Sequence, residues 1–326
     1  MIKMITEFLR RLLYIVPSAP ANVQIAITNK CNFSCKMCQR FDLKVRLGDM
    51  SLEDFKKVLR HIGTAKNVVL TGWGEPLLHP DLIEMIRLCK EKGCDVCFTS
   101  NGNLLTPELG QKLINSGLDA ITFSVDAIKS DDAEFGHPIQ EQLNNIRQFI
   151  KTVREQKFKT EIYLQSTYHK NKEQDLYDVV EFGKEIGVNR LRFSRLDVRF
   201  QKFERPSFED EKKLIRNIES RIKDTGIGID FLPHVASDGF SKFIFKLTSP
   251  FLHRFGKYCL RTYNDIYINE DGKATPCCAL PNLIMGDARE DSLESIWNNV
   301  NFRRFRCKQN IACGECDVLK IKTFNK

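Results

Sequence analysis

Short runs of β-forming residues alternate with amphipathic segments of helical periodicity from residue 22 to about residue 200. The expected strands are "NVQIAIT", "NVVLTG", "DVCFTS", "DAITFSVD", "EIYLQST" and "RLRFS". In the segments between them, apolar residues recur at the spacing of one helix face. This alternation is typical of βα units that build a parallel sheet.

The expected helices carry their own start and stop residues. Ser51 with Asp54 three residues later forms a capping pattern, and Pro80 and Pro107 stand at helix starts. The glycines at expected helix ends are Gly93, Gly117 and Gly187. Six units are two fewer than an eight-stranded barrel needs, so the predicted fold class is α/β, a partial (β/α)6 TIM-like barrel. Its functional residues are expected in the loops after the strands.

The regular alternation ends near residue 200, which predicts further segments. Residues 201–255 contain a long helix, capped by Ser207, and a linker with no clear period. Residues 256–326 carry a new group of cysteines and are predicted to form a small C-terminal module. Residues 1–21, apolar at helical spacing before Pro17, predict an N-terminal helix. We expect it to pack on the core, residues 22–200; peripheral contact with a membrane surface is the alternative.

Composition narrows the setting. The chain of 326 residues has 12 cysteines, no cleavable signal and no apolar run of the ~20 residues that a membrane span requires. We therefore predict a cytoplasmic protein, in which thiols stay reduced and clustered cysteines bind metal rather than form disulfides. The net charge of +8 is spread over mixed-charge stretches, which are typical of solvated helix faces. The sequence lacks a basic stripe with interleaved aromatic residues, the pattern that would indicate nucleic-acid binding.

Three cysteines, Cys31, Cys35 and Cys38, follow the first strand with the spacing C-x3-C-x2-C. Structural zinc is usually held by four ligands in two pairs on separate loops, which this spacing does not provide. Three thiolates on one loop suit a 4Fe-4S cluster with one iron left open.

With this motif on the loop after the first strand, the sequence resembles the radical SAM superfamily over residues 22–200. The resemblance implies that S-adenosylmethionine binds the open iron and is reductively cleaved. The resulting 5′-deoxyadenosyl radical then abstracts a hydrogen atom from the substrate. It also implies an external electron donor such as flavodoxin or ferredoxin.

The same resemblance assigns cofactor-binding residues. "TGWGEP" is similar to the family's glycine-rich motif, with Gly72 and Gly74 allowing close backbone approach and Glu75 accepting from the methionine ammonium. Trp73 stands where the family usually has glycine, and we expect its ring to pack sideways. Asn101, Ser124 and Asp126, at the strand ends, are predicted to contact the ribose or amino-acid groups. Met37, in the cysteine loop, is predicted to pack on adenine.

The partner of the S-adenosylmethionine carboxylate is left open. The arginine that the family often has after its "SVD"-type motif is missing from "AIKSDDAEFGHPI". The candidates are His137, Arg192 and Arg195. The remaining histidines form no ligand pair and are interpreted as structural or surface residues.

Cys89, Cys94 and Cys97 have the spacing of part of a ferredoxin loop. The first lies within an expected helix and the last in the middle of an expected strand, so their thiols should not converge. We interpret them as small hydrophobic core residues.

The C-terminal cysteines form a different pattern. Cys259 and Cys277 flank an expected hairpin turned at Asp271-Gly272, and Cys313 and Cys316 form a C-x-x-C pair after an expected helix "SLESIWNNVNFRRF". The segment resembles the SPASM or shortened twitch extension of radical SAM enzymes. That resemblance implies one auxiliary 4Fe-4S cluster with four ligands, Cys259, Cys277, Cys313 and Cys316. Their number also suits zinc, and Cys278 and Cys307 remain unassigned.

The resulting functional prediction is a radical SAM oxidoreductase whose auxiliary cluster oxidises the substrate radical. A small-molecule substrate is favoured, because only about 20 residues precede the barrel and peptide-modifying relatives often have a leader-binding domain there. A peptide substrate is the first alternative. A zinc protein that binds nucleic acid and a catalytically silent cluster protein are alternatives from other classes. No residue is distinctive enough to be named as the proton-accepting base.

Overall fold

A computed structural model describes residues 16–129, 138–168, 170–196, 204, 206–232, 259–313 and 316. Residues 1–15 of the predicted N-terminal helix and most of the predicted linker before residue 255 lie outside these ranges. The strands are β1 (Asn22–Ile25), β2 (Asn67–Val69), β3 (Asp95–Ser100), β4 (Ala120–Ser124), β5 (Glu161–Tyr168), β6 (Arg190–Arg195), β7 (Gly228–Leu232), β8 (Asp265–Ile268), β9 (Lys273–Thr275) and β10 (Gly286–Asp287).

The helices alternate with the strands along the chain. They are α2 (Leu52–His61), α3 (Leu82–Glu91), α4 (Pro107–Asn115), α6 (Ile139–Glu155), α7 (Glu173–Ile186), α8 (Phe208–Ile222), α10 (Leu293–Asn298), α11 (Val300–Cys307) and α12 (Gln309–Cys313), with the 3-10 helices η1 (Pro76–Leu78) and η2 (Leu260–Tyr263).

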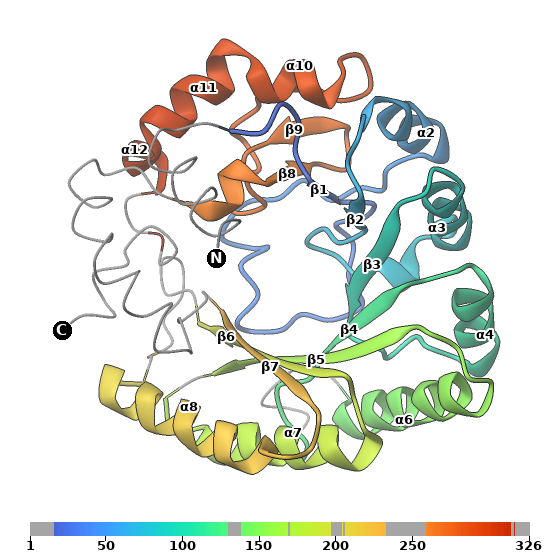
Figure 1. Cartoon of the computed structure of the whole chain (residues 1–326), viewed down its shortest axis with the longest axis vertical. Helices are drawn as coiled ribbons and strands as arrows, with labels where there is room; N and C mark the ends of the chain where they lie inside the picture. Colours follow the sequence, from blue (N-terminus) through green and yellow to red (C-terminus); the bar gives the residue numbers. More distant parts are fainter. Residues whose placement is uncertain are drawn as a thin grey trace.

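The described strands form one sheet in the order β10-β9-β8-β1-β2-β3-β4-β5-β6-β7. Pairing from β1 through β7 is parallel throughout. The strands curve round a common centre, and α2, α3, α4, α6, α7 and α8 lie on their outer side (Figure 1). The predicted α/β class and partial-barrel architecture are confirmed, and each of the six predicted strands is present.

The parallel sheet continues beyond the six predicted units. After α8, β7 pairs in parallel with β6, so the sheet passes the predicted core boundary at residue 200 and reaches Leu232. The expectation that the unit breaks down near residue 200 is therefore wrong. The strand is the short run "GIDFL", which begins with glycine and gives a weak β signal on its own.

The C-terminal segment adds an antiparallel hairpin to the same sheet. β8 and β9 form the predicted hairpin, and Gly272 in its turn has a φ of 78°. β8 in turn pairs in parallel with β1, which the sequence did not indicate. The predicted single helix "SLESIWNNVNFRRF" is two helices, α10 and α11. Asn299 separates them because its backbone is extended and its side chain caps α11 at Phe302 N–H.

Helix termini follow local chemistry closely. The Ser51 side chain accepts a hydrogen bond from Asp54 N at 3.0 Å at the start of α2, and Pro107 is the first residue of α4. α3 begins at Leu82, two residues after Pro80. The three glycines predicted at helix ends, Gly93, Gly117 and Gly187, have φ values of 78°, 85° and 62°.

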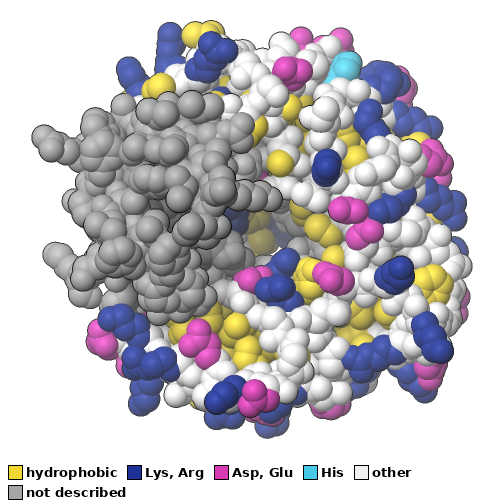
Figure 2. Space-filling view, in the orientation of Figure 1, with side chains coloured by type: hydrophobic (Ala, Val, Ile, Leu, Met, Phe, Trp, Pro, Cys, Tyr) yellow, Lys and Arg dark blue, Asp and Glu magenta, His cyan; other side chains and the backbone are white. Residues whose placement is uncertain are grey.

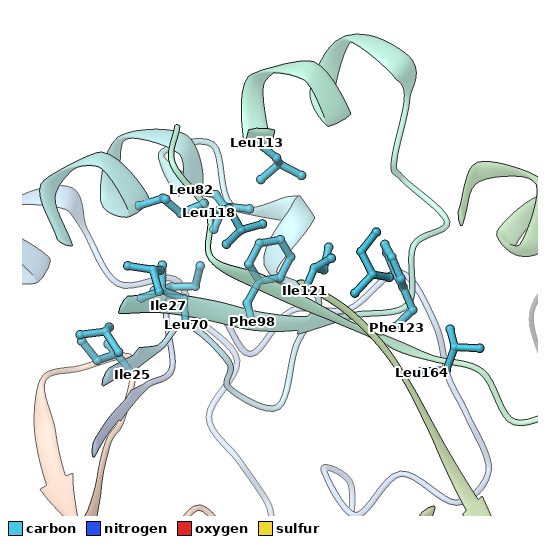
Figure 3. Packing of buried hydrophobic residues seen from close by; sticks show 14 of the residues in the cluster. Ile25, Ile27, Leu70, Leu82, Phe98, Leu113, Leu118, Ile121, Phe123 and Leu164 are labelled. Atoms are coloured by element: carbon cyan, nitrogen blue, oxygen red, sulfur yellow. The ribbon is translucent and has the colours of Figure 1, made fainter. Parts of the chain in front are cut away.

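The main core lies between the sheet and the outer helices. Leu82 of α3 and Leu113 of α4 pack over Phe98 and Ile121 of the strands (Figure 3). These side chains are at most 2% exposed. Each buried side chain of this size contributes about 1.5–3 kcal/mol to stability, so the layer holds the strands in register.

The inner face of the sheet is polar. Along β3, β5 and β6, buried residues under the helices alternate with half-buried residues on the other face. The half-buried set includes Thr99, Gln165, Arg192 and Ser194. The centre of the molecular face seen in Figure 2 is hollowed, with charged side chains at its rim. The inner face therefore offers hydrogen-bonding groups rather than an apolar filling.

Candidate functional site

The loop after β1 carries the first cysteine group, Cys31, Cys35 and Cys38, and all three side chains are half-buried. Phe33 N–H donates to Cys31 Sγ at 3.4 Å, and Cys38 N–H donates to the Cys35 carbonyl at 3.0 Å. Local backbone hydrogen bonds therefore fix the path of the loop around its thiols.

Arg40 closes this loop, a role that the sequence did not reveal. Its buried guanidinium donates to the Asn29 carbonyl at 3.3 Å and to the Phe33 carbonyl at 3.2 Å. Because a guanidinium presents several donors in a fixed plane, one side chain can tie together both ends of the turn.

The three thiols share one electrostatic environment. Burial, with smaller contributions from the nearby Asp126, Cys38 and Cys31, raises the pKa of Cys35 to about 12. Burial also raises the pKa of Cys31, to which Glu75 and Cys38 add. A metal must therefore displace protons from these thiols when it binds.

The donor set fits an iron-sulfur cluster. Three cysteine sulfurs from one loop are the ligand type and number that a 4Fe-4S cluster with an open iron requires. Among the described residues, no three His, Cys, Asp or Glu side chains converge on the position of a single metal ion. The cysteine loop thus fits a 4Fe-4S cluster in the type of its ligands and in their spacing along the chain.

The "GWGEP" loop after β2 lies directly on the cysteine loop. Glu75 N–H donates to the Lys30 carbonyl at 2.8 Å. A Cβ added to Gly72 would lie 2.7 Å from the Thr28 carbonyl oxygen, and one added to Gly74 would lie 2.7 Å from Lys30 N. Glycine is therefore required at both positions for the two loops to touch.

Glu75 is a buried carboxylate with three hydrogen-bond donors and no cation. It is 2% exposed and accepts from Ser100 Oγ at 2.8 Å, Asn101 N at 2.7 Å and Leu77 N at 3.0 Å. Burial raises its pKa to about 7, and the described residues contribute no positive charge that opposes this. A cationic ligand would supply the missing charge, which fits the predicted ammonium contact.

Asn101, Ser124 and Asp126 lie at the carboxyl ends of β3 and β4, beside the cysteine loop. Asp126 accepts from Thr167 N at 2.7 Å, and burial raises its pKa to about 6. Asn101 Nδ2 donates to Asn32 Oδ1 at 2.9 Å. Since Asp126 also influences Cys35, the predicted polar groups and the thiols are brought to the same edge of the sheet.

Gln142 on α6 supports this edge from behind. Its buried amide donates to the Asn101 carbonyl at 2.8 Å and to the Ser124 carbonyl at 2.6 Å. The role of Gln142 was not predicted from the sequence. A lone glutamine on the buried face of an amphipathic helix was the available signal.

The other predicted contacts with S-adenosylmethionine are those of Met37 and of the three candidate partners of the carboxylate. Met37 is half-buried and packs against the core. Arg195 is bound to Glu211 of α8 at 2.8 Å in a buried ion pair, which removes it as a carboxylate partner. Arg192 bonds Thr122 Oγ1 at 3.2 Å and stacks on the Tyr163 ring. His137 lies outside the described residues.

The C-terminal cysteines come from three separate elements. Cys259 precedes η2, Cys277 follows β9, and Cys313 ends α12; each is half-buried, as is Cys316. Burial, with smaller contributions from Cys277 and Cys316, raises the pKa of Cys259 to about 11, so the three thiols share one electrostatic environment. Cys316 N donates to the Cys313 carbonyl at 2.8 Å.

Cys278, the residue after Cys277, is half-buried like the four predicted ligands, whereas Cys307 is exposed. The hydrogen bond from Cys277, together with the positive charge of Arg261, lowers the pKa of Cys278 to about 7. Cys307 is exposed on α11. Trp73 reaches the same loop, donating from Nε1 to the Cys278 carbonyl at 3.0 Å, so its ring does pack sideways.

In the third cysteine group, Cys89 and Cys94 are core residues as predicted, whereas Cys97 is not. Cys89 and Cys94 are at most 1% exposed in the core. Cys97 is half-buried in the middle of β3, and burial raises its pKa. Cys89, by contrast, belongs to α3 on the outer side of the sheet.

Comparison with protein families identifies both halves of the molecule. Residues 25–183 match the model of the radical SAM superfamily, and residues 259–317 match the SPASM iron-sulfur cluster-binding domain. The chain belongs to the radical SAM superfamily. It is therefore a radical SAM enzyme that uses a 4Fe-4S cluster with S-adenosylmethionine and has auxiliary iron-sulfur ligation in its SPASM domain. The zinc-protein alternative does not account for these matches.

Relatives agree with this membership. The AdoMet-dependent heme synthase of Methanosarcina barkeri is 23% identical over 93% of this chain and 90% of its own length. SuiB of Streptococcus suis, solved bound to the precursor peptide SuiA, has a TM-score of 0.70 at 17% identity and covers 98% of this chain and 74% of its own. Native anSMEcpe with bound AdoMet has a TM-score of 0.64 at 16% identity, covering 88% and 83%. The two structures show that the radical SAM enzyme shares their fold.

None of the helices in the described part of the radical SAM enzyme has the length and hydrophobicity that a bilayer crossing requires.

Proposed function

We propose that this radical SAM enzyme catalyses a net two-electron oxidation of its substrate. When bound by Cys31, Cys35 and Cys38, the first cluster supplies the electron that cleaves S-adenosylmethionine, and the radical so formed takes a hydrogen atom from the substrate. The single observation that carries the proposal is the pairing of this loop with a second cysteine site on the same sheet. The second site would accept the electron that the substrate radical must lose.

The first site is prepared for S-adenosylmethionine by its own side chains. Glu75 would hold the ammonium group, because it is a buried carboxylate that has no cationic partner among the described residues. Asn101, Ser124 and Asp126 would orient the ribose or amino-acid groups from the ends of β3 and β4. The Met37 thioether would pack on adenine. These groups replace water around the cofactor with fixed dipoles.

The second site would hold one auxiliary 4Fe-4S cluster. Its ligands would be Cys259, Cys277, Cys313 and Cys316, of which the first, second and fourth share one electrostatic environment. Four protein ligands leave no iron open for a substrate, so the cluster would pass electrons without binding the reacting molecule.

A small-molecule substrate is supported by the likeness to the heme synthase, which extends over nearly the whole length of both chains. A peptide substrate is the second candidate. The solved relatives SuiB and anSMEcpe were crystallised with peptides and share the fold of this chain. The polar inner face of the sheet can provide hydrogen bonds to either class.

Anaerobic purification with iron and sulfide analysis tests the proposal. We expect a brown protein with about eight irons per chain, two cubes of four. Dithionite with S-adenosylmethionine should then yield 5′-deoxyadenosine. A protein with about four irons would exclude the auxiliary cube, and a fully loaded protein that never cleaves S-adenosylmethionine would exclude the reaction.

A further inference from the structure

Trp73 occupies an unusual place in the "GWGEP" loop. Its backbone belongs to the loop that lies on the first cysteine group, whereas its indole reaches the loop of the second. The Nε1–H donates to the Cys278 carbonyl at 3.0 Å. Cys278 is adjacent in sequence to Cys277, a predicted ligand of the auxiliary cluster. Trp73 thus contacts both cysteine regions.

Asn29 anchors the backbone of Trp73. The Asn29 Oδ1 accepts from Trp73 N–H at 3.0 Å, and its carbonyl accepts from Arg40, which closes the first cysteine loop. Asn29 is 1% exposed and stands two residues before Cys31. The position of the indole is therefore fixed relative to the first cysteine group.

The same asparagine also holds the C-terminal hairpin. Asn29 Nδ2 donates to Glu270 Oε2 at 2.7 Å, in a contact that is buried on both sides. One residue earlier, Asn269 Nδ2 donates to the Pro281 carbonyl at 2.8 Å. The loop 276–283 is consequently held at two points, near its start by Trp73 and near its end by Asn269.

We propose that Trp73 is a positioning residue that fixes the Cys277–Cys278 loop of the SPASM domain against the first cysteine loop. A glycine at this position could not make the contact, because it has no side chain to reach the Cys278 carbonyl. The inference rests on the proposed function in one respect, because it takes both cysteine groups to hold clusters. The contact of Trp73 would then keep the separation between the two clusters constant.

The test compares Trp73→Phe with Trp297→Phe. The chain has two tryptophans, and both donate an indole N–H to a backbone carbonyl. Trp297 on α10 donates to the Pro17 carbonyl, in the segment before β1, at 2.9 Å. The two variants therefore lose the same kind of hydrogen bond in different places. Trp73→Gly removes the ring as well and serves as a second variant.

Hydrogen exchange of the cluster-loaded enzyme is the first measurement. We expect backbone amides of residues 276–283 to exchange about fivefold to tenfold faster in Trp73→Phe, the factor that loss of one hydrogen bond represents. Trp73→Gly should be at least as fast. Trp297→Phe should leave this loop unchanged. Equal exchange in Trp73→Phe and wild type would overturn the proposal.

The second measurement is electron paramagnetic resonance of the dithionite-reduced enzyme. The magnetic interaction between two reduced clusters depends on their separation. If the loop is released, the separation varies, so the spectral lines due to this interaction should become broader or weaker in Trp73→Phe. The same lines should be unchanged in Trp297→Phe. A faster-exchanging loop with an unchanged spectrum would refute the role in cluster placement. Failure of the proposed function is distinguishable, because it would appear in the wild type as a missing second cluster signal.

Discussion

The two cysteine regions of this enzyme are built in opposite ways. The first places Cys31, Cys35 and Cys38 on one loop whose path is fixed by its own backbone and by Arg40. The second gathers cysteines from η2, the loop after β9 and the end of α12. A site of the first kind needs little more than its loop, whereas a site of the second kind exists only when the domain is folded and docked.

Their electrostatics differ as well. Carboxylates stand beside the first group, where Glu75 and Asp126 raise the pKa of Cys31 and Cys35. A cation, Arg261, stands beside the second group, where the hydrogen bond from Cys277 and the charge of Arg261 lower the pKa of Cys278 to about 7. The hydrogen bond to Cys278 and burial raise the pKa of Cys277. Negative charge suits a site that must bind a cationic cofactor, and positive charge suits a cluster surrounded by thiolates.

The sharpest test of this contrast is a pair of ligand removals. Cys35→Ala should abolish cleavage of S-adenosylmethionine, because the first cluster cannot form with two thiolates. Cys313→Ala should retain cleavage but stop formation of oxidised product. Iron content and 5′-deoxyadenosine yield, measured for both variants beside the wild type, decide between them. Equal loss of cleavage in the two folded variants would contradict the division of labour.

Gln142→Leu should weaken the first region from behind. Two carbonyls at the ends of β3 and β4 would lose their donor, which costs about 2–4 kcal/mol of unfolding free energy. Urea unfolding of the full-length protein measures this cost. Gln148→Leu, at an exposed position on the same helix, is the matched control and should change stability by less than about 0.5 kcal/mol. Similar costs for both would rule out the supporting role of Gln142.

Glu75→Gln should change how stability depends on pH. The folded-state pKa of Glu75 is raised to about 7 from the ordinary 4.5, so the folded protein binds more protons than the unfolded chain between these values. Stability of the wild-type apoprotein therefore falls as pH rises through this window, by up to about 3 kcal/mol from this group. The slope should flatten in the variant, whatever its absolute stability.

The same substitution should weaken binding of S-adenosylmethionine by about tenfold or more, since a charge-assisted hydrogen bond to the ammonium is lost. Equilibrium binding to the cluster-loaded protein measures this. An unchanged affinity together with an unchanged pH slope would show that Glu75 carries no charge toward the cofactor.

The smallest effects are expected in the third cysteine group. Cys89→Ala should cost about 1 kcal/mol of stability, because it leaves a small cavity in the core. Its iron content should equal that of the wild type, within error, by metal analysis. Loss of about four irons would mean that this group, too, binds a cluster.

The sequence predicted the parts of the molecule that depend on short-range patterns. The structure has the predicted strands β1 to β6, the predicted cap at Ser51 and the predicted helix start at Pro107. These features, like the position of the first cysteine loop, follow from periodicity and from residues a few positions apart. The order of the motifs along the chain then indicated the edge of the sheet where the site lies. The family comparisons confirmed the superfamily that these motifs indicated.

Contacts between segments far apart in the chain could not be predicted from the sequence. Pairing of β1 with β8 joins residues more than 240 positions apart, and nothing local marks either strand as the partner of the other. Gln142 and Trp73 could not be given partners for the same reason. The break at Asn299 was missed because apolar periodicity continues across it, and only the backbone angle of one residue separates α10 from α11.

Pairing of β1 with β8 has a consequence for biosynthesis. A chain made from its amino terminus presents β1 early, but the neighbour on that side of β1 is synthesised about 240 residues later; Asn22 and Asp265 are separated by 243 positions. The first cysteine loop hangs from the end of an incompletely paired strand until then. Completion of the sheet beside that loop is accordingly a late event, because β1 is paired on both edges only after β8 has been synthesised.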